Sequence, residues 1–344
     1  MAFFSKLKRR IYNTSKPSPR NIITAQHLRE TPLFTDTPDF DVDSYVNGLD
    51  VKPDYDLAQK LRDWRKDGIV LFEDAVPHNH IDLFLNDLEN ITATSGYDVE
   101  IEIRGKRVNL RDTPIDPLSD IGVKFNCLEN ISFAARQLSL NAFISDFLFH
   151  VFQSSPTTLQ SLTFWRGSNQ PTHVDYPYVC TQTKLGQLAA SWIPLEDVHA
   201  DSGPLAYYPG SHKLDVIPPY DWGHGSMILE EDSKKTPGDI VTYLQKHIKR
   251  KKLERRIYTP KKGDLLIWHG LLAHEGSKTV DPTRTRKSYV THYTGLNTYP
   301  PDHMFKDAYN KSKFTTLNNG YVFDKPWTHD VRRLPSWDKH TPKT

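Results

Sequence analysis

The chain has 344 residues, with 44 Lys and Arg against 42 Asp and Glu, which gives a formal net charge of +2. This length supports one large domain or two modest ones, with a core that needs neither disulfides nor a structural metal. The balanced charge provides no global field for nucleic acid, and 2 cysteines are too few for a disulfide framework. We expect a cytoplasmic protein without a transmembrane segment, because no apolar run approaches the length of a membrane span.

Aromatic residues are frequent, with 7 Trp, 16 Tyr and 16 Phe, and the chain also contains 24 Pro and 17 Gly. This composition favours a loop-rich, mainly β enzyme with some α-helix over a helical bundle or a disordered protein. Residues 1–50 are predicted to form a basic, irregular N-terminal arm, since six of the first 20 residues are Lys or Arg and none is acidic. Residues 51–344 are predicted to form a single domain.

The first part of this domain is predicted to be largely helical. Apolar residues at i, i+4 and i+7 indicate a helix over residues 55–67, and a buried strand follows over residues 69–72. A second helix begins near residue 80, a hairpin is expected over residues 99–110, and residues 131–150 have the pattern of a helix in two pieces.

The pattern changes near residue 158, where short β-type runs separated by turn residues begin to dominate. The predicted strands are residues 159–165, 188–194, 205–208, 264–268 and 288–293. Helices followed by many short strands predict a double-stranded β-helix, a cupin-like jelly roll, behind an N-terminal helical layer.

A helical insertion interrupts these strands at about residues 214–258. The helix begins with Thr236 as its N-cap, proline in the first position and an acid in the third. It ends in a basic run over residues 246–256, with seven Lys or Arg in eleven positions. We expect Lys249, Arg250, Lys251 and Lys252, assisted by the arm, to attract an anionic substrate or an anionic membrane surface. Alternatively, these cations only solvate an exposed helix end.

The most informative pattern is His173 and Asp175, which stand two residues apart in an extended run and therefore point to the same face. His274 is the candidate third ligand, and His269 is its rival. Two imidazoles and one carboxylate form the facial triad of non-haem Fe(II) oxygenases, which leaves positions for a bidentate 2-oxo acid and O2. The His-X-Asp triplet alone arises by chance, so it needs support from its context. Three other histidines have no partner at ligand spacing, namely His199, His224 and His292.

Arg286 provides that support from the strand that follows His274 by twelve residues. An arginine presents a planar fork that pairs bidentately with a carboxylate. It can therefore bind the far carboxylate of a 2-oxo diacid that chelates iron through its other end. Arg284 is a competitor for this role.

Several stretches resemble the phytanoyl-CoA dioxygenase family of Fe(II)/2-oxoglutarate oxygenases. They are residues 172–175 (THVD), 190–197 (ASWIPLED), 202–213 (SGPLAYYPGSHK) and 263–274 (GDLLIWHGLLAH), followed by Arg286. The run from Gly203 to Lys213 is the most diagnostic, and it implies a tight turn that crosses the barrel between the metal-binding strands. Detailed resemblance covers about residues 160–295.

The resemblance implies that His173, Asp175 and His274 bind Fe(II), and that Arg286 binds the carboxylate of 2-oxoglutarate. Three further residues correspond to co-substrate residues of the family: Trp192, Ser277 and Lys124. For Trp192 the alternative is a core tryptophan, and for Lys124 a solvated lysine is favoured. For Ser277 the match depends on the segment from His274 to Arg286, which is one residue longer than the usual spacing. His212 is expected to stabilise a turn.

By resemblance, the chain is a dioxygenase that hydroxylates a small organic substrate and converts 2-oxoglutarate to succinate. The alternatives are a protein or peptide hydroxylase of the same superfamily and a non-catalytic jelly-roll binding protein. A halogenase is disfavoured because Asp175 is present. A cupin-type hydrolase or isomerase would not need Arg286. The substrate itself does not follow from the fold.

Overall fold

The computed structural model describes residues 23–94, 96–103, 106–113, 115–116, 122–179, 184–229, 233–299, 314–325 and 331–338. The helices in these ranges are α2 (Ala25–Glu30), α3 (Val42–Asn47), α4 (Leu57–Asp67), α5 (His78–Ala93), α6 (Phe133–Ser139), α7 (Ala142–Phe152), α8 (Pro237–Lys251) and α9 (Pro335–Asp338), with short 3-10 turns such as η1 (Phe34–Asp36). The strands are β1 (Ile69–Phe72), β2 (Glu100–Ile103), β3 (Lys106–Asn109), β4 (Lys124–Asn126), β5 (Pro156–Phe164), β6 (Ala189–Pro194), β7 (Leu205–Tyr207), β8 (Arg256–Tyr258), β9 (Leu265–His269), β10 (His274–Gly276), β11 (Ser288–Gly295), β12 (Phe314–Leu317) and β13 (Gly320–Phe323).

The strands form two sheets. The larger sheet has the order β1-β9-β6-β11-β5-β4-β2-β3, with the β12–β13 pair attached through β13 to β5, and the smaller sheet has the order β10-β7-β8. From β5 onward the chain passes back and forth between the sheets: β5 and β6 join the larger one, β7 and β8 the smaller one, β9 the larger, β10 the smaller and β11 the larger again. An isolated bridge between His173 and His274 adds one more extended segment beside β10. This winding confirms the predicted double-stranded β-helix.

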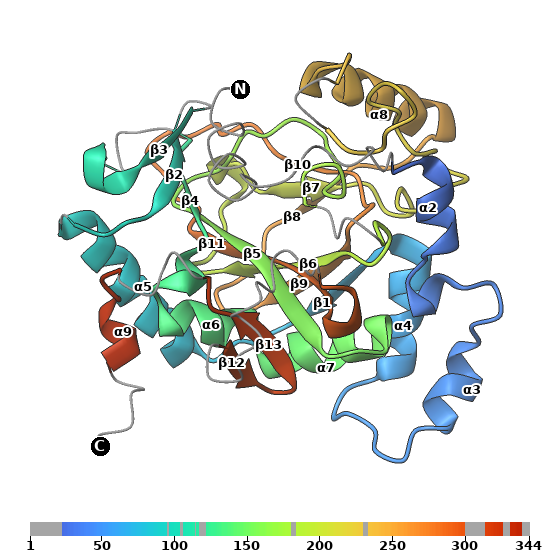
Figure 1. Cartoon of the computed structure of the whole chain (residues 1–344), viewed down its shortest axis with the longest axis horizontal. Coiled ribbons are helices and arrows are strands. Elements are labelled where there is room, and N and C mark those ends of the chain that lie inside the picture. Colours follow the sequence, from blue (N-terminus) through green and yellow to red (C-terminus); the bar gives the residue numbers. More distant parts are fainter. Residues whose placement is uncertain are drawn as a thin grey trace, which may run out of the picture.

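Alternate residues of the larger sheet bury against different partners, as the period of two in a β-strand requires. Leu265, Ile267 and Tyr289 join the core that the helices form on one face. Leu266 and Trp268 instead join a second cluster that includes Leu205 and other residues of the smaller sheet. In Figure 1, α5, α6 and α7 lie along one side of the sheets and α8 lies on the opposite side. The space between the two sheets is therefore lined by the other face of these strands.

Most predicted elements are present, with shifted ends. The helix predicted over residues 55–67 begins at Leu57, because the side chain of Asp56 accepts a hydrogen bond from the backbone of Gln59. Gly68 ends it with a positive φ of 75°. The predicted helix over residues 131–150 is indeed two helices, α6 and α7.

The predicted arm and insertion are described in part. Residues 1–22 lie outside the described residues, whereas residues 23–50 contain α2, η1 and α3 and bury Leu28 and Leu33. The boundary at residue 50 stays a prediction. In the insertion, α8 has the expected capping box between Thr236 and Asp239. The last residues of the predicted insertion form β8, which belongs to the smaller sheet.

Candidate metal centre

His173 and His274 face each other across the bridge beside β10. The backbone N–H of His173 donates to the carbonyl of His274 at 2.9 Å, and the reverse bond measures 3.0 Å. This pairing places the two imidazole rings with their centroids 4.2 Å apart. Asp175 lies two residues beyond His173, and its N–H donates to the carbonyl of Gly270 at 3.1 Å. The extended backbone thus brings all three side chains to one face.

The three ligand atoms converge at the spacing that a metal ion requires. Oδ1 of Asp175 lies 3.8 Å from Nε2 of His173 and 3.6 Å from Nε2 of His274. One atom of each residue lies within 4.8 Å of the other two. Within the described residues, this is the single group of three or more His, Cys, Asp or Glu with that property.

The other nitrogen of each imidazole is held by the backbone. Nδ1 of His173 lies 2.9 Å from the carbonyl of Pro171, and Nδ1 of His274 lies 3.0 Å from the carbonyl of Leu272. A carbonyl only accepts, so these contacts assign the proton to Nδ1 and leave the Nε2 lone pair free. Metal-binding histidines are commonly oriented in this way. The donor set therefore fits a divalent metal ion.

Asp175 is oriented by a buried tryptophan and a third histidine. The indole Nε1 of Trp268 donates to Oδ2 of Asp175 at 2.8 Å. Nε2 of His292, from β11, lies 3.7 Å from the same oxygen. Sequence reasoning missed His292 because it is distant from the motif in sequence. Its position on the same strand face as Arg286, six residues later, was the available signal.

The electrostatics of the site favour a neutral His173 beside an ionised Asp175. Burial, and then the neighbouring His274, lower the pKa of His173 to about 3. Burial alone would raise the pKa of Asp175, but the imidazoles of His274, His292 and His173 hold that pKa below its usual range. A carboxylate and neutral histidines are the protonation states in which these groups bind a metal.

His269, the rival ligand, has both ring nitrogens engaged elsewhere. Its Nε2 lies 2.8 Å from Oδ2 of Asp36 on η1, and its Nδ1 accepts from the N–H of Leu271 at 3.0 Å. The ring of His212 packs on it, with centroids 5.2 Å apart. His269 therefore links the N-terminal segment that contains η1 to the jelly-roll core. The geometry favours His274, rather than His269, as the metal ligand.

Arg286 and Arg284 have opposite environments. Arg284 is 44% exposed and pairs with Asp281 at 3.1 Å. Arg286 precedes β11 by two residues and is only 2% exposed. Among the described residues its guanidinium has no ion-pair or hydrogen-bond partner, and it lies 5.6 Å from the ring centroid of Trp192 and 5.7 Å from that of Phe164. Burial lowers the pKa of Arg286 to about 10. A buried cation without a hydrogen bond has the capacity to pair with an anion.

The two remaining co-substrate candidates already have protein partners. The hydroxyl of Ser277 accepts from Arg255 at 2.7 Å. Lys124, on β4, pairs with Glu102 at 2.9 Å, and its side chain is 19% exposed. Lys124 is near enough to the metal centre to help lower the pKa of His173. Their roles toward a co-substrate stay predictions.

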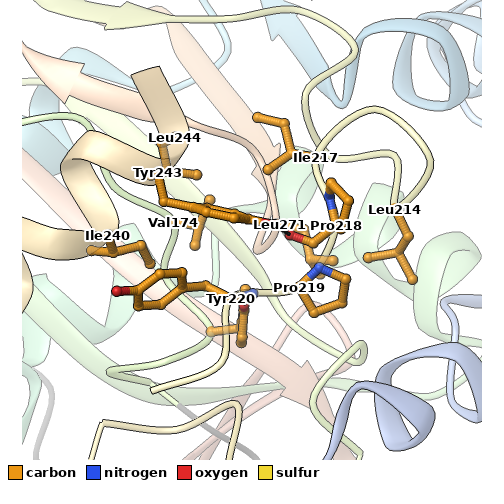
Figure 2. Close-up of a pocket in the computed structure, with 11 residues that line it drawn as sticks. Val174, Leu214, Ile217, Pro218, Pro219, Tyr220, Ile240, Tyr243, Leu244 and Leu271 are labelled. Carbon is orange, nitrogen blue, oxygen red and sulfur yellow. Dashed lines mark hydrogen bonds between the residues drawn. The ribbon is translucent and has the colours of Figure 1, made fainter. Parts of the chain in front are cut away.

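A small apolar pocket lies next to the metal-binding segment but not at the metal centre. Val174, between the two ligands of its segment, points away from them and lines this pocket. Figure 2 shows Ile240, Tyr243 and Leu244 of α8 closing the pocket over Val174 and Leu271. The pocket therefore lies where α8 packs against the outside of the smaller sheet.

A family model matches most of the chain, including the segments that carry the candidate ligands. The family described as phytanoyl-CoA dioxygenase (PhyH) matches residues 64–287, which is more than half of the chain. The chain belongs to the phytanoyl-CoA dioxygenase family. The candidate ligands His173, Asp175 and His274 lie within the matched range, and so does Arg286.

Relatives within this family are distant. The phytanoyl-CoA dioxygenase domain-containing protein 1 homologue of Caenorhabditis elegans is 22% identical over 167 residues, which cover 46% of this chain and 53% of the relative. Its Caenorhabditis briggsae counterpart is 22% identical over 161 residues, with the same coverage. The chain thus spans about half the length of the curated relatives it matches.

Solved structures share the fold. EctD from S. alaskensis in its apoform has a TM-score of 0.50 and 14% identity, with 92% of this chain and 96% of that chain covered. EctD with bound Fe has a TM-score of 0.50 and 15% identity, covering 82% and 91%. This likeness agrees with the jelly-roll core. No helix in the described part of the chain is long and apolar enough to cross a membrane.

Proposed function

We propose that the chain is an Fe(II)- and 2-oxoglutarate-dependent dioxygenase that hydroxylates a small organic substrate. The observation that carries the proposal is the combination of three convergent ligand atoms with a buried, unpaired arginine. The ligands are His173, Asp175 and His274, and the arginine is Arg286. Burying a cation without a partner costs free energy, and a protein that binds a metal but no 2-oxo acid has nothing to offset this cost.

Each residue has a role that follows from its contacts. His173 and His274 would bind Fe(II) through Nε2, and Asp175 would bind through Oδ1 while Trp268 holds Oδ2. Arg286 would pair with the far carboxylate of 2-oxoglutarate against Trp192. The bound iron would supply the oxidising chemistry, in which O2 is consumed and 2-oxoglutarate becomes succinate and CO2. The buried residues between the sheets would keep water from this reaction.

The fold is able to house these ligands. EctD from S. alaskensis, with a TM-score of 0.50 and 14% identity over 74% of this chain, has been crystallised with 2-oxoglutarate and 5-hydroxyectoine. The substrate of the present chain is a separate matter. We extend the proposal to an anionic small molecule, because Lys249, Lys251 and Lys252 are exposed where α8 ends.

Isotope labelling tests the proposal. The purified chain, loaded with Fe(II) and 2-oxoglutarate without oxygen, is exposed to labelled O2, and succinate is analysed by mass spectrometry. We expect succinate that carries one labelled oxygen atom, and none from Asp175→Ala. Unlabelled or absent succinate would contradict the proposal and favour a non-catalytic binding protein. If labelled succinate is found, an untargeted metabolite comparison would identify the substrate as a compound that gains one oxygen atom.

A further inference from the structure

Thr172 and Glu275 occupy the face of the metal-binding strands that points away from the metal. Because His173 pairs with His274 in antiparallel fashion, Thr172 lies opposite Glu275, one position along each strand. Their side chains therefore share the outer face, while the two histidines share the inner one. The hydroxyl of Thr172 donates to Oε2 of Glu275. This bond directly joins the two strands that carry the ligands.

Backbone bonds join the two segments at few positions. β10 is 3 residues long, and its partner segment is joined by an isolated bridge rather than a regular ladder. The backbone bonds are the two between His173 and His274 and one from the N–H of Gly276 to the carbonyl of Gln170 at 3.0 Å, and β10 also pairs with β7. The outer-face contacts add to these bonds in holding His173 and His274 at the right spacing.

Glu275 is also bound by the segment that follows α8. Nε of Arg255 donates to Oε1 of Glu275 at 2.6 Å, and the guanidinium of Arg255 also donates to Ser277 at 2.7 Å. The phenol of Tyr208 donates to Oε2 of Glu275 at 3.4 Å. Arg255 thus binds the middle residue of β10 and the residue that follows the strand, and the carboxylate of Glu275 accepts hydrogen bonds from three segments.

The other strand is held by α8 itself. The amide of Gln245 donates to the hydroxyl of Thr172 at 2.6 Å. Next to it, Ile240 and Leu244 pack over Val174 and Leu271 in the pocket of Figure 2. The apolar contact fixes where α8 sits, and the polar bonds fix the strands relative to it.

We propose that Arg255 and Glu275, joined through Thr172 to Gln245, are positioning residues that set the spacing of the metal-binding histidines. The inference rests on the proposed metal centre. It states that the predicted insertion helps to set the geometry of that centre. None of these four residues belongs to the proposed ligand set. They would act through the backbone of the strands that carry the ligands, one step further out than the direct hydrogen-bond partners of metal ligands.

Cobalt binding without turnover tests this proposal. Co(II) is titrated into the full-length chain, and both its affinity and its ligand-field absorption spectrum are recorded. Arg255→Met should weaken Co(II) binding about tenfold and alter the spectrum. This is the lower end of the range of affinity losses known for residues around metal ligands, and we expect it because the Arg255 side chain is 35% exposed. Lys246→Met removes the same charge from an exposed position on α8 and is the matched control. Thr172→Val should act like Arg255→Met, whereas Thr172→Ser, which keeps the hydroxyl, should restore the parental spectrum.

The outcomes separate the two levels of the proposal. If Arg255→Met and Thr172→Val bind Co(II) with parental affinity and spectrum, the positioning role is wrong although the metal centre stands. Lower melting temperatures with an unchanged spectrum would likewise overturn it, because they indicate a structural role only. If the parent binds no Co(II), or His274→Ala binds it as well as the parent, the proposed metal centre itself is wrong and the positioning role falls with it.

Discussion

The indole of Trp268 donates to Oδ2 of Asp175 at 2.8 Å, and this leaves Oδ1 of the carboxylate facing the two imidazoles. The hydrogen bond fixes which oxygen is presented to a metal. Trp268→Phe keeps most of the ring but removes the donor, so the carboxylate can rotate. We expect Fe(II) or Co(II) binding to weaken by about 10- to 100-fold, as for other second-sphere changes.

Trp222→Phe is the matched control for this substitution. Trp222 is also fully buried, and its Nε1 has no hydrogen-bond partner among the described residues. Both variants lose similar packing, but only one loses a bond to a ligand. Equal metal affinity in the two variants would show that the orientation of Asp175 does not depend on Trp268.

The environments of His274 and His269 predict different defects. His274→Ala removes a ligand and should abolish stoichiometric metal binding, measured by titration with Co(II). His269→Ala should retain the metal but lower the melting temperature, because it breaks the bond to Asp36 at 2.8 Å. Loss of a buried, charge-assisted bond costs about 1.5–3 kcal/mol. The reverse pattern would exchange the two assignments.

The sequence predicts long elements better than short ones. The helix α4 has three buried residues on one face and a terminal glycine, and β9 is buried along its whole length, so both were predicted. The strands β4, β8 and β10 each have 3 residues, too few to show a period. The equally short β7 was predicted because it lies in the run from Gly203 to Lys213 that resembles the family. β4 pairs with β2 and β5, and β8 and β10 both pair with β7, so these strands depend on partners that no local pattern shows.

The candidate site shows the same limit. His173, Asp175 and His274 could be chosen because two of them share a strand face and a motif. The contact between His292 and Asp175 depends on the register of β11 beside β6, which pairs His292 with Ala190. The bond from Arg255 to Ser277 depends on where the insertion packs. Neither contact could be derived from spacing along the chain.

Acid should destabilise the folded chain through His212. Burial, and then the nearby His269, lower the pKa of His212 to about 3 from an ordinary value of 6.5. Below pH 6.5 the unfolded chain therefore binds a proton that the folded chain excludes, so stability falls as the pH decreases toward about 3. Denaturant titrations of parent and His212→Gln between pH 7 and 4 should give a shallower pH dependence for the variant. Parallel curves would show that His212 does not contribute.

Salt should reveal whether the exposed end of α8 attracts substrate. Attraction between exposed charges fades as the Debye length falls to about 3 Å at 1 M salt. Once a substrate is known, its apparent constant should rise with salt for the parent and stay flat for a variant with Lys249, Arg250, Lys251 and Lys252 replaced by Gln. Sedimentation with anionic vesicles under the same conditions tests the membrane alternative. Identical salt responses of the two proteins would assign these cations to solvation alone.

Arg286 should stabilise the bound co-substrate at the expense of the empty protein. Its side chain is 2% exposed and its guanidinium has no ion pair or hydrogen bond among the described residues. Glu196 acts on it electrostatically, but burial outweighs this effect and lowers the pKa of Arg286, so the free protein buries a charge that is only partly compensated. Two charge-assisted hydrogen bonds to a carboxylate are worth about 3 kcal/mol together, which corresponds to about a 100-fold change in affinity. Arg286→Leu should therefore weaken 2-oxoglutarate binding to the metal-loaded, oxygen-free protein by about 100-fold while metal affinity stays the same.

The same substitution should leave the metal-free, ligand-free protein as stable as the parent or more stable. Replacing a partly compensated buried charge with an apolar side chain of similar volume removes its desolvation cost. Arg284→Leu is the control, because its side chain is 44% exposed and already pairs with Asp281. We expect Arg284→Leu to change neither 2-oxoglutarate affinity nor melting temperature appreciably. A destabilised Arg286→Leu protein with parental co-substrate affinity would mean that the arginine stabilises the fold and that another cation binds the carboxylate, with Lys124 as the next candidate because it lies near His173.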